Sequence, residues 1–217
     1  MKPALHIAAL ALAFVLWLPC VAAAEAPSRE QALQSLNGED PQVRREAASR
    51  LGEVGTMADV PPLVRTLHDP DEETRAEAQE ALWHIWARSG DAEVDALYRK
   101  GIDEMTAGDL ESAIATFTRI IEIKPDFAEG WNKRATLYFL TGELRKSLAD
   151  CDEVIKRNPY HFGALAGYAQ IYIRLEQYER ALEYARKALE INPNLEGMRR
   201  AIDALEEAIE ERRRNTI

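Results

Sequence analysis

Histidine and cysteine are the residue types of this chain best suited to metal binding or nucleophilic catalysis. Beyond position 24 the histidines are His68, His84 and His161. None of them belongs to a His-x-x-x-His or Glu-x-x-His group, the spacing that places two metal ligands on one helix face. Cys151 is the single cysteine of the same range, so no disulfide can form within it. We therefore predict no metal site, no cofactor and no catalytic residue.

The charge balance of the 217-residue chain is acidic. It has 27 Lys and Arg against 37 Asp and Glu, a formal net charge of −10. Proteins that bind nucleic acid or anionic membranes normally carry a basic surface. The composition therefore disfavours a nucleic-acid partner.

The segment from Met1 to Ala24 has the pattern of a secretory signal peptide. Lys2 precedes an apolar run over residues 4–21, and three alanines precede Glu25. A positive start, an apolar centre and a small-residue end are the three parts of such a signal. The run is marginal for a membrane span, which needs about 20 residues. We predict cleavage near Ala24 and export to a bacterial periplasm. A membrane anchor, or a lipoprotein lipidated on Cys20, is the alternative.

Three prolines recur at equal spacing along the chain, at Pro125, Pro159 and Pro193. Other positions come into register with them. Twelve residues earlier stand Ala113, Ser147 and Ala181, and eight residues earlier stand Phe117, Cys151 and Ala185. Such a period predicts two helices per unit, with small residues where the helices cross closely. Proline ends each unit because inside a helix it costs about 3 kcal/mol.

These columns resemble the tetratricopeptide repeat, a helix–turn–helix module whose length equals the interval between the prolines. The family pattern W-x2-L-G-x2-Y…A-x3-F…P is represented by Trp131, Tyr138, Ala113, Phe117 and the three prolines. Arg134 and Tyr168 depart from it, because they stand where the family has leucine. The resemblance implies an all-α fold, a right-handed α-solenoid of helix-turn-helix repeats.

The resemblance also implies boundaries. Residues 91–195 would hold three units, at 94–127, 128–161 and 162–195. Residues 196–217 carry apolar side chains in one stripe at helical spacing, and the other positions are mostly Glu and Arg. We therefore predict a C-terminal capping helix that covers the last unit.

A second repeat, with a shorter period, lies upstream within residues 25–90. The segment from Asp40 to Leu51 matches the segment from Asp71 to Leu82 at its Asp, Arg, Glu, Ala and Leu positions. It resembles the HEAT-like repeats of phycobilin-lyase-related proteins, which implies two pairs of a short and a longer helix. The family's ladder would pair an Asp with the Arg six residues on, here Asp69 and Arg75.

Two HEAT-like repeats alone bury little core, since about three are needed for a stable stack. We therefore expect the pair to dock onto the first tetratricopeptide unit. The aromatic segment Leu82-Trp83-His84-Ile85-Trp86 would lie at that contact. The two tryptophans predict a buried seam, and a site that stacks a ligand is the alternative.

The first helices of the tetratricopeptide units would line a concave groove. The resemblance places these ligand-binding candidates in it: Tyr98, Ile102, Met105, Asn132, Thr136, Phe139, Leu140, Ala166, Gln170, Ile173 and Arg174. Apolar and hydrogen-bonding side chains of this kind suit a peptide ligand. Chaperone-binding members of the family capture a terminal carboxylate with Lys and Asn. Tyr98 and Ile102 occupy those two positions here, so that mode is not expected.

The leading hypothesis is an exported, non-enzymatic scaffold that binds a protein or peptide of unknown identity through this groove. One alternative is a self-associating structural protein whose groove is an interface between copies. The other is an enzyme that uses Asp, Glu or His68 of the HEAT-like half. Fold alone does not decide among them.

Overall fold

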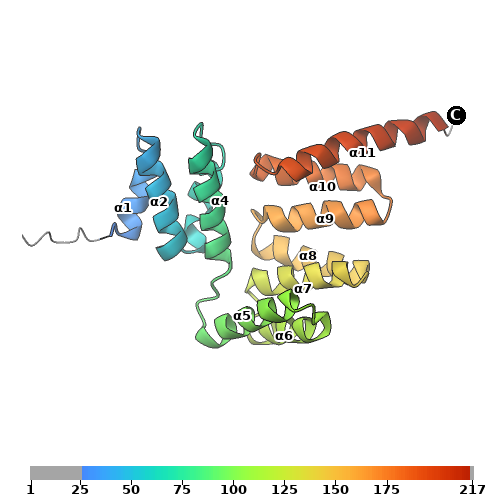
Figure 1. Cartoon of the computed structure of the whole chain (residues 1–217), viewed down its shortest axis with the longest axis horizontal. Helices are drawn as coiled ribbons and strands as arrows, with labels where there is room; N and C mark the ends of the chain where they lie inside the picture. The colour runs from blue at the N-terminus through green and yellow to red at the C-terminus, as the bar shows by residue number, and fades with distance from the viewer. Residues whose placement is uncertain (1–25, 216–217) are drawn as a thin grey trace, which may run out of the picture.

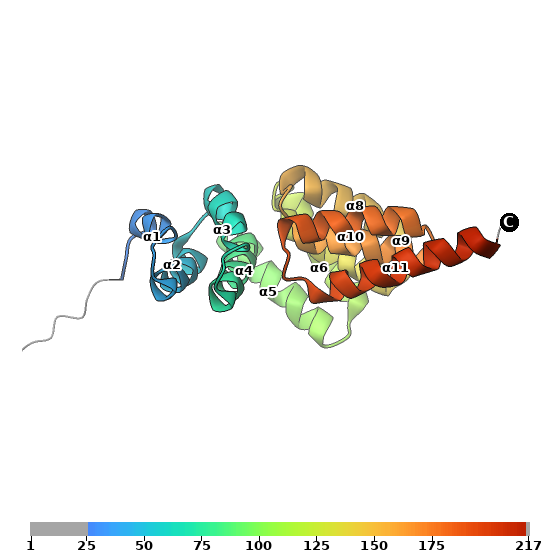
Figure 2. The same cartoon turned by 90° about the horizontal axis from the view of Figure 1, so that it is seen from above.

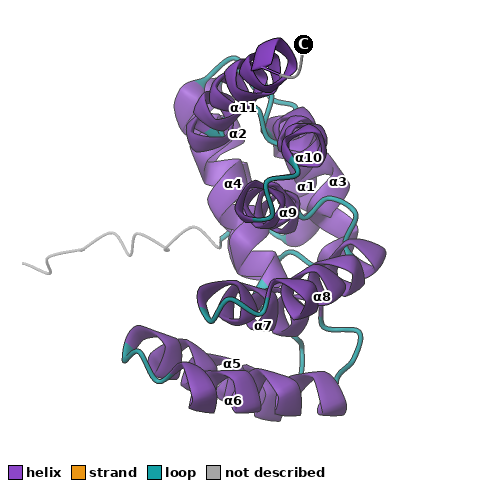
Figure 3. Cartoon of the chain, turned by 90° about the vertical axis from the view of Figure 1, so that its right-hand side faces the viewer, coloured by secondary structure: helices purple, strands orange, loops and turns teal. Residues whose placement is uncertain are grey.

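The computed structural model describes residues 26–215, and this part of the chain is helical. It contains eleven α-helices and one short 3-10 turn, η1 (Met57–Asp59), with no strand in the described range (Figure 3). The predicted all-α solenoid of helix pairs is confirmed. The predicted signal peptide lies outside the described residues.

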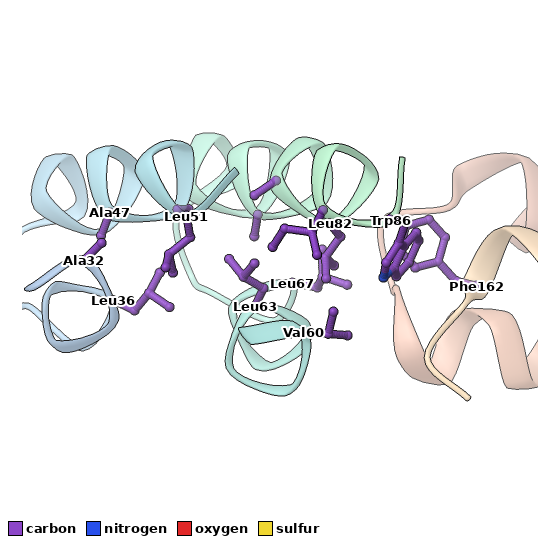
Figure 4. Packing of buried hydrophobic residues seen from close by; sticks show 14 residues of the cluster. Ala32, Leu36, Ala47, Leu51, Val60, Leu63, Leu67, Leu82, Trp86 and Phe162 are labelled. Atoms are coloured by element: carbon purple, nitrogen blue, oxygen red, sulfur yellow. The ribbon is translucent and has the colours of Figure 1, made fainter. Parts of the chain in front are cut away.

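The N-terminal block consists of two helix pairs, each a short helix followed by a longer one (Figure 1). They are α1 (Arg29–Ser35), α2 (Pro41–Val54), α3 (Val60–Thr66) and α4 (Glu72–Trp86). Asp40 and Asp71 hold equivalent positions in the two pairs, and each accepts a backbone N–H at the start of its longer helix. These caps satisfy donors that the first helical turn leaves without partners. Buried leucines and alanines fill the space between the helices (Figure 4).

The remaining helices stack as three pairs and one terminal helix. The pairs are α5 (Ala92–Thr106) with α6 (Leu110–Ile123), α7 (Ala128–Leu140) with α8 (Leu144–Arg157), and α9 (Phe162–Arg174) with α10 (Tyr178–Ile191). The small residues Ala113, Ser147 and Ala181 are all buried, as predicted. Ser147 satisfies its hydroxyl by donating to the Ala135 carbonyl oxygen at 2.7 Å. These columns therefore hold the two helices of each pair close together.

The first pair shows how residue sizes compensate within a unit. Phe117 on α6 is fully buried against Gly101 on α5. A Cβ at Gly101 would lie 2.7 Å from the Phe117 Cζ, closer than atoms can pack. In the third unit the corresponding residues are Ala169 and Ala185, both fully buried. The Phe117 ring therefore requires glycine opposite it in the first unit, whereas the small Ala185 leaves room for a methyl group at position 169.

The terminal helix α11 (Glu196–Asn215) lies along α10 and continues past it (Figure 2). Met198, Leu205 and Ile209 are buried on the inner side of α11. Its remaining positions are mostly charged and exposed. This one-sided helix covers the apolar flank of the last pair.

The N-terminal block does not pack where the sequence predicts. Trp83 and Trp86 contact His161 and Phe162, at the turn before α9 and the start of that helix. The predicted seam of tryptophans is confirmed, but the expectation that it contacts the first tetratricopeptide unit is wrong. Figure 1 shows the reason: the stack starts at α5 and α6 and runs back, which brings α9 and α10 beside the block. The last pair therefore becomes its neighbour.

Candidate functional site

Four of the eleven predicted groove residues meet at one cavity. It has a volume of about 60 Å³ and lies between α7, α8 and α9. Asn132, Thr136 and Phe139 come from α7, and Gln170 comes from α9. The structure therefore brings predicted residues of two successive units into one site.

The predicted residues of the first unit are not part of this cavity. Tyr98, Ile102 and Met105 are partly buried and pack against the core between α5 and α6. The Tyr98 ring meets Phe117 and Phe127 edge-on, at centroid distances of 5.9 and 5.8 Å. Burial, with a smaller contribution from the Glu129 carboxylate, raises the pKa of the Tyr98 phenol. These three side chains contribute to packing in the first unit.

The other four predicted residues are not among those that line the cavity. Arg174 places its guanidinium 4.8 Å from the centre of the Phe139 ring and donates to the Phe139 carbonyl oxygen at 2.7 Å. Leu140 is 55% exposed. Ala166 packs against the core shared with α10 and α11, and Ile173 is half-buried. Arg174 thus places a charged group against Phe139, and Leu140, the next residue along α7, is an exposed apolar side chain.

Asn132 belongs to a buried polar cluster that sequence reasoning missed. Its amide donates to Glu129 Oε2 at 2.8 Å, and Glu129 is 1% exposed. His161 Nδ1 accepts the Ala164 N–H, so Nε2 carries the proton and faces Glu129 Oε1 at 3.3 Å. The Asn132 amide is therefore already engaged. Glu129 and His161 are 32 residues apart, out of step with the period of the prolines, so no repeat column pairs them.

The buried Glu129 gives a prediction about pH. Burial opposes its ionisation, but the His161 hydrogen bond and the Lys133 charge outweigh burial and hold its pKa at about 2. A carboxyl with a depressed pKa stabilises the fold above its unfolded pKa and loses that contribution as pH falls through the folded value. We expect Glu129→Gln to be less stable than the parent at pH 7. The difference should shrink between about pH 4.5 and 2.

Urea unfolding at each pH measures this difference. Glu122→Gln is the matched control, because Glu122 is exposed and pairs with the exposed Arg119 at 3.2 Å. It should cost less than about 0.5 kcal/mol at pH 7. A Glu129→Gln deficit that stays constant down to pH 2 contradicts the prediction.

Nucleophilic or metal chemistry has no support in the part of the chain that the structure describes. Cys151 is buried, and burial, then Asp150 and Asp152, raise the pKa of its thiol to about 12. A protonated thiol is a poor nucleophile. Residues 26–215 contain no cluster of three His, Cys, Asp or Glu side chains that could hold a metal ion. None of the described helices has the length and apolarity needed to cross a bilayer.

The prediction that the Asp69 side chain pairs with Arg75 is wrong, because Arg75 binds Asp69 through the carbonyl oxygen, at 2.9 Å. Asp69 instead accepts two hydrogen bonds from Arg44, at 2.7 and 2.8 Å. The physical reason is the same for both arginines. Each uses Nη1 to bind the carbonyl oxygens five and six residues before it, which directs Nε toward the next unit. The ladder therefore runs from one repeat to the next.

We call the turns at Pro125, Pro159 and Pro193 the first, second and third closing turns of the stack. The third closing turn, after α10, continues the ladder. Arg75 Nε donates to Asn194 Oδ1 at 2.7 Å, and Asn194 Nδ2 donates to the Leu67 carbonyl oxygen at 2.9 Å. Asn192 Nδ2 donates to Gln79 Oε1 at 2.6 Å. This turn occupies the place of a third HEAT-like repeat, which supplies the neighbour that the two-repeat block lacks.

The second closing turn supplies the apolar part of the same contact. Trp86 is 3% exposed and stacks on His161 with ring centroids 4.5 Å apart. Phe162 lies 5.1 Å from Trp86 and 5.2 Å from Trp83, and belongs to the same core as the leucines of the block (Figure 4). The seam joins the two halves of the chain through aromatic packing.

Gly163 provides a test of that packing. A Cβ there would lie 2.6 Å from Trp83 Cη2, whereas a Cβ at Gly167, one turn later on α9, would meet only Cys151 Sγ at 3.8 Å. We expect Gly163→Ala to lower the free energy of unfolding by about 1–3 kcal/mol, because it overpacks the seam. Gly167→Ala should be neutral or slightly stabilising. Urea denaturation of both variants compares them, and equal effects would contradict this description of the seam.

Comparison with known proteins agrees with both repeat types. A model of HEAT repeats matches residues 21–115. Two models of the tetratricopeptide repeat match residues 98–162 and 162–195. The chain is a HEAT and tetratricopeptide repeat protein. The two families meet at α5 and α6, where the matched ranges overlap.

Proteins named for tetratricopeptide repeats are similar to about half of this chain. A TPR repeat-containing protein of Rhizobium etli is 37% identical over 111 residues, 50% of this chain and 53% of its own. Tetratricopeptide repeat protein 12 of Mus musculus is 31% identical over 101 residues, 46% of this chain and 14% of its own. This chain therefore spans about half of the first relative and a small part of the second.

Two solved tetratricopeptide domains are similar in fold to somewhat more than half of the chain. The Sgt2 TPR domain from Aspergillus fumigatus has a TM-score of 0.54 and 24% identity, covering 57% of this chain and 83% of its own. A second is the first TPR domain of Spaghetti (RPAP3), bound to an HSP90 peptide. It has a TM-score of 0.53 and 21% identity, covering 55% of this chain and 95% of its own.

Proposed function

We propose that this chain is an exported, non-enzymatic scaffold that binds a protein or peptide on the face formed by α7 and α9. The observation that carries the proposal is the cavity where Thr136, Phe139 and Gln170 meet. An aromatic ring beside a hydroxyl and an amide offers both apolar burial and hydrogen bonds. That combination suits a peptide with an apolar anchor held in a helical groove.

The surface next to the cavity supports a docking role. Leu140 is the most exposed large apolar side chain among the described residues. Arg174 lies against Phe139 and keeps a charged group at the edge of the same surface. An apolar centre with a polar rim is the usual organisation of a protein-binding surface.

The comparison with chaperone-binding proteins bears on how a peptide would be held, by an apolar anchor or by its terminal carboxylate. The RPAP3 domain of similar fold is bound to an HSP90 peptide, and we propose that this chain also uses the first-helix face for a peptide. Tyr98 and Ile102 stand where the family resemblance places the Lys and Asn of chaperone-binding members, and both pack into the first unit here. We therefore expect recognition of an apolar anchor and no capture of a terminal carboxylate.

Site-specific photo-crosslinking in the native host tests the groove. A photo-reactive residue at Gln170 should yield a discrete crosslinked protein, because Gln170 is exposed and lines the cavity. Phe139→Ala in the same background should lower the yield at least about tenfold, the expected effect of losing one aromatic anchor. The matched control carries the photo-reactive residue at Arg145, an exposed position on α8.

The outcomes separate the hypotheses. The same product from position 145, or no effect of Phe139→Ala, removes the groove from the proposal. A product of twice the chain's mass identifies self-association, and sedimentation then tests whether the parent is a dimer at working concentrations.

Export rests on residues 1–24 and has its own test. Cell fractionation should place the protein in the periplasm, and intact mass should correspond to a chain that begins near Glu25. A full-length chain recovered from the membrane would favour an anchor instead.

A further inference from the structure

A second cavity lies between the N-terminal block and the closing turns of the stack, apart from the groove. Its volume is about 260 Å³. Trp86 and Arg88 line it from the end of α4, and Lys124 and Asn158 line it from the first and second closing turns. It shares no lining residue with the groove cavity.

Two buried donors at this cavity have no acceptor among the described residues. They are Trp86 Nε1 and Asn158 Nδ2. Both residues are more than nine-tenths buried, at 3% and 1% exposure. Buried N–H groups are ordinarily paired, so two unpaired donors at one cavity call for an acceptor.

The repeat itself indicates where Asn158 Nδ2 is directed. Asn192 holds the same position in the next unit, and its Oδ1 accepts the Asn194 N–H just as Asn158 Oδ1 accepts the Tyr160 N–H. With the amide fixed in this way, Asn192 Nδ2 donates across the seam to Gln79. Because its Oδ1 is held in the same way, we infer that Asn158 Nδ2 points toward the N-terminal block, where it has no acceptor among the described residues.

The electrostatics around the cavity favour a negative ligand. Lys124, Arg88 and Arg157 line it together with one carboxylate, Asp126, and Arg157 is also paired with Glu153 outside the lining. Arg88 is fixed by donating to the carbonyl oxygens of Gly52 and Gly55, so its charge stays in place at no further ordering cost.

The start of helix α7 adds to the positive potential. Its N-cap residue, Phe127, makes no side-chain capping hydrogen bond, and Ala128 lines the cavity. The free N–H groups and the dipole of a helix start attract anions. α7 has 13 residues, so its dipole is that of a full helix.

We propose that this cavity binds an oxyanion, a carboxylate or phosphate group of a small organic ligand. Trp86 Nε1, Asn158 Nδ2 and the Lys124 ammonium would donate to its oxygens. Phe127 and the exposed Met57 would contact its carbon part. A ligand bound here touches the N-terminal block and two closing turns at once, so it stabilises the docked arrangement of the two halves.

Titration of the ¹⁵N-labelled full chain with sodium succinate, and separately with inorganic phosphate, tests the site at constant ionic strength. The Trp86 indole resonance, assigned with Trp86→Phe, should shift saturably, and that of Trp131 should not. Lys124→Gln should weaken binding about tenfold, the effect of losing one charge-assisted hydrogen bond. Whichever probe saturates first distinguishes a carboxylate from a phosphate ligand.

Lys156→Gln is the matched control. It removes one positive charge from an exposed lysine two residues before Asn158, outside the cavity. Binding by this variant should stay within about twofold of the parent, as expected for a screened surface charge. Two results overturn the proposal: no saturable shift with either probe at about 50 mM, or equal weakening by both lysine variants.

Discussion

Trp86→Ala is expected to lower the free energy of unfolding by about 3–5 kcal/mol, the range for removing a buried aromatic side chain. Trp86 lies in the core of the N-terminal block and also stacks on His161 of the second closing turn. Its loss therefore opens a cavity that neither half can fill alone. Urea denaturation followed by circular dichroism measures the change.

Trp131→Ala is the control for this prediction. Trp131 is half-buried on the outer surface, where it donates to the Pro125 carbonyl oxygen at 2.9 Å and stacks with Arg134 and Arg157. One hydrogen bond and exposed cation–π contacts predict a cost of about 1–2 kcal/mol. Similar costs for the two tryptophans would contradict the central place given to Trp86.

The repeat period of the sequence predicts where the helices lie within each unit, but not where the N-terminal block contacts the stack. The Asp40 cap and the small column of Ala113, Ser147 and Ala181 are local features, and each was readable because its partners lie within one unit. Arg75 and Asn194 are 119 residues apart. Their contact depends on where the stack returns to the block, and no column of the sequence records that path. The seam was therefore predicted correctly and its partner was not.

The groove residues were also only partly predictable from the sequence. Resemblance to the family assigns each residue to a helix face, and Thr136, Phe139 and Gln170 do share a cavity. It does not say which neighbour covers that face. Tyr98 is covered by Phe117 and Phe127, which follows from the choice of glycine at position 101 and the aromatic rings around it.

The turns inside the units provide a further case. Gly108 and Gly142 have positive φ, and Glu176 occupies the corresponding position with φ of 57°. A non-glycine residue there is strained by about 1–2 kcal/mol. Arg212 of α11 donates to the Glu176 carbonyl oxygen and carboxylate, at 3.0 and 2.9 Å. The missing glycine was visible in the sequence, but the stabilising contact from α11 was not.

The departures from the family pattern at Arg134 and Tyr168 have a structural explanation. Arg134 Nη1 donates to Thr118 Oγ1 at 3.1 Å, and the Tyr168 hydroxyl donates to Asp152. Thr118 and Asp152 hold the same position in successive units, so each departure reaches back to an equivalent residue of the unit before it. Polar bridges between units thus replace the leucine contact of the family.

Arg134→Met is expected to lower the free energy of unfolding at pH 7 by about 3–5 kcal/mol. Arg134 binds the Asp150 carboxylate through two hydrogen bonds, at 2.7 and 2.8 Å, and both side chains are largely buried. Removing the guanidinium leaves the Asp150 charge buried without its partner. The double variant Arg134→Met/Asp150→Leu should recover most of the loss, because apolar residues of similar size can replace a buried ion pair.

The exposed pair of Arg119 and Glu122 provides the comparison for that loss. Arg119→Met should change the free energy of unfolding by less than about 0.5 kcal/mol, because both side chains of this pair are exposed and the Glu122 carboxylate stays in water without its partner. If Arg134→Met costs no more than Arg119→Met, the buried pair of Arg134 and Asp150 contributes nothing. If the double variant stays as unstable as the single one, the loss comes from the contacts of the guanidinium with the rings of Trp131 and Tyr138. A recovery in the double variant alone identifies the unpaired carboxylate as the cause.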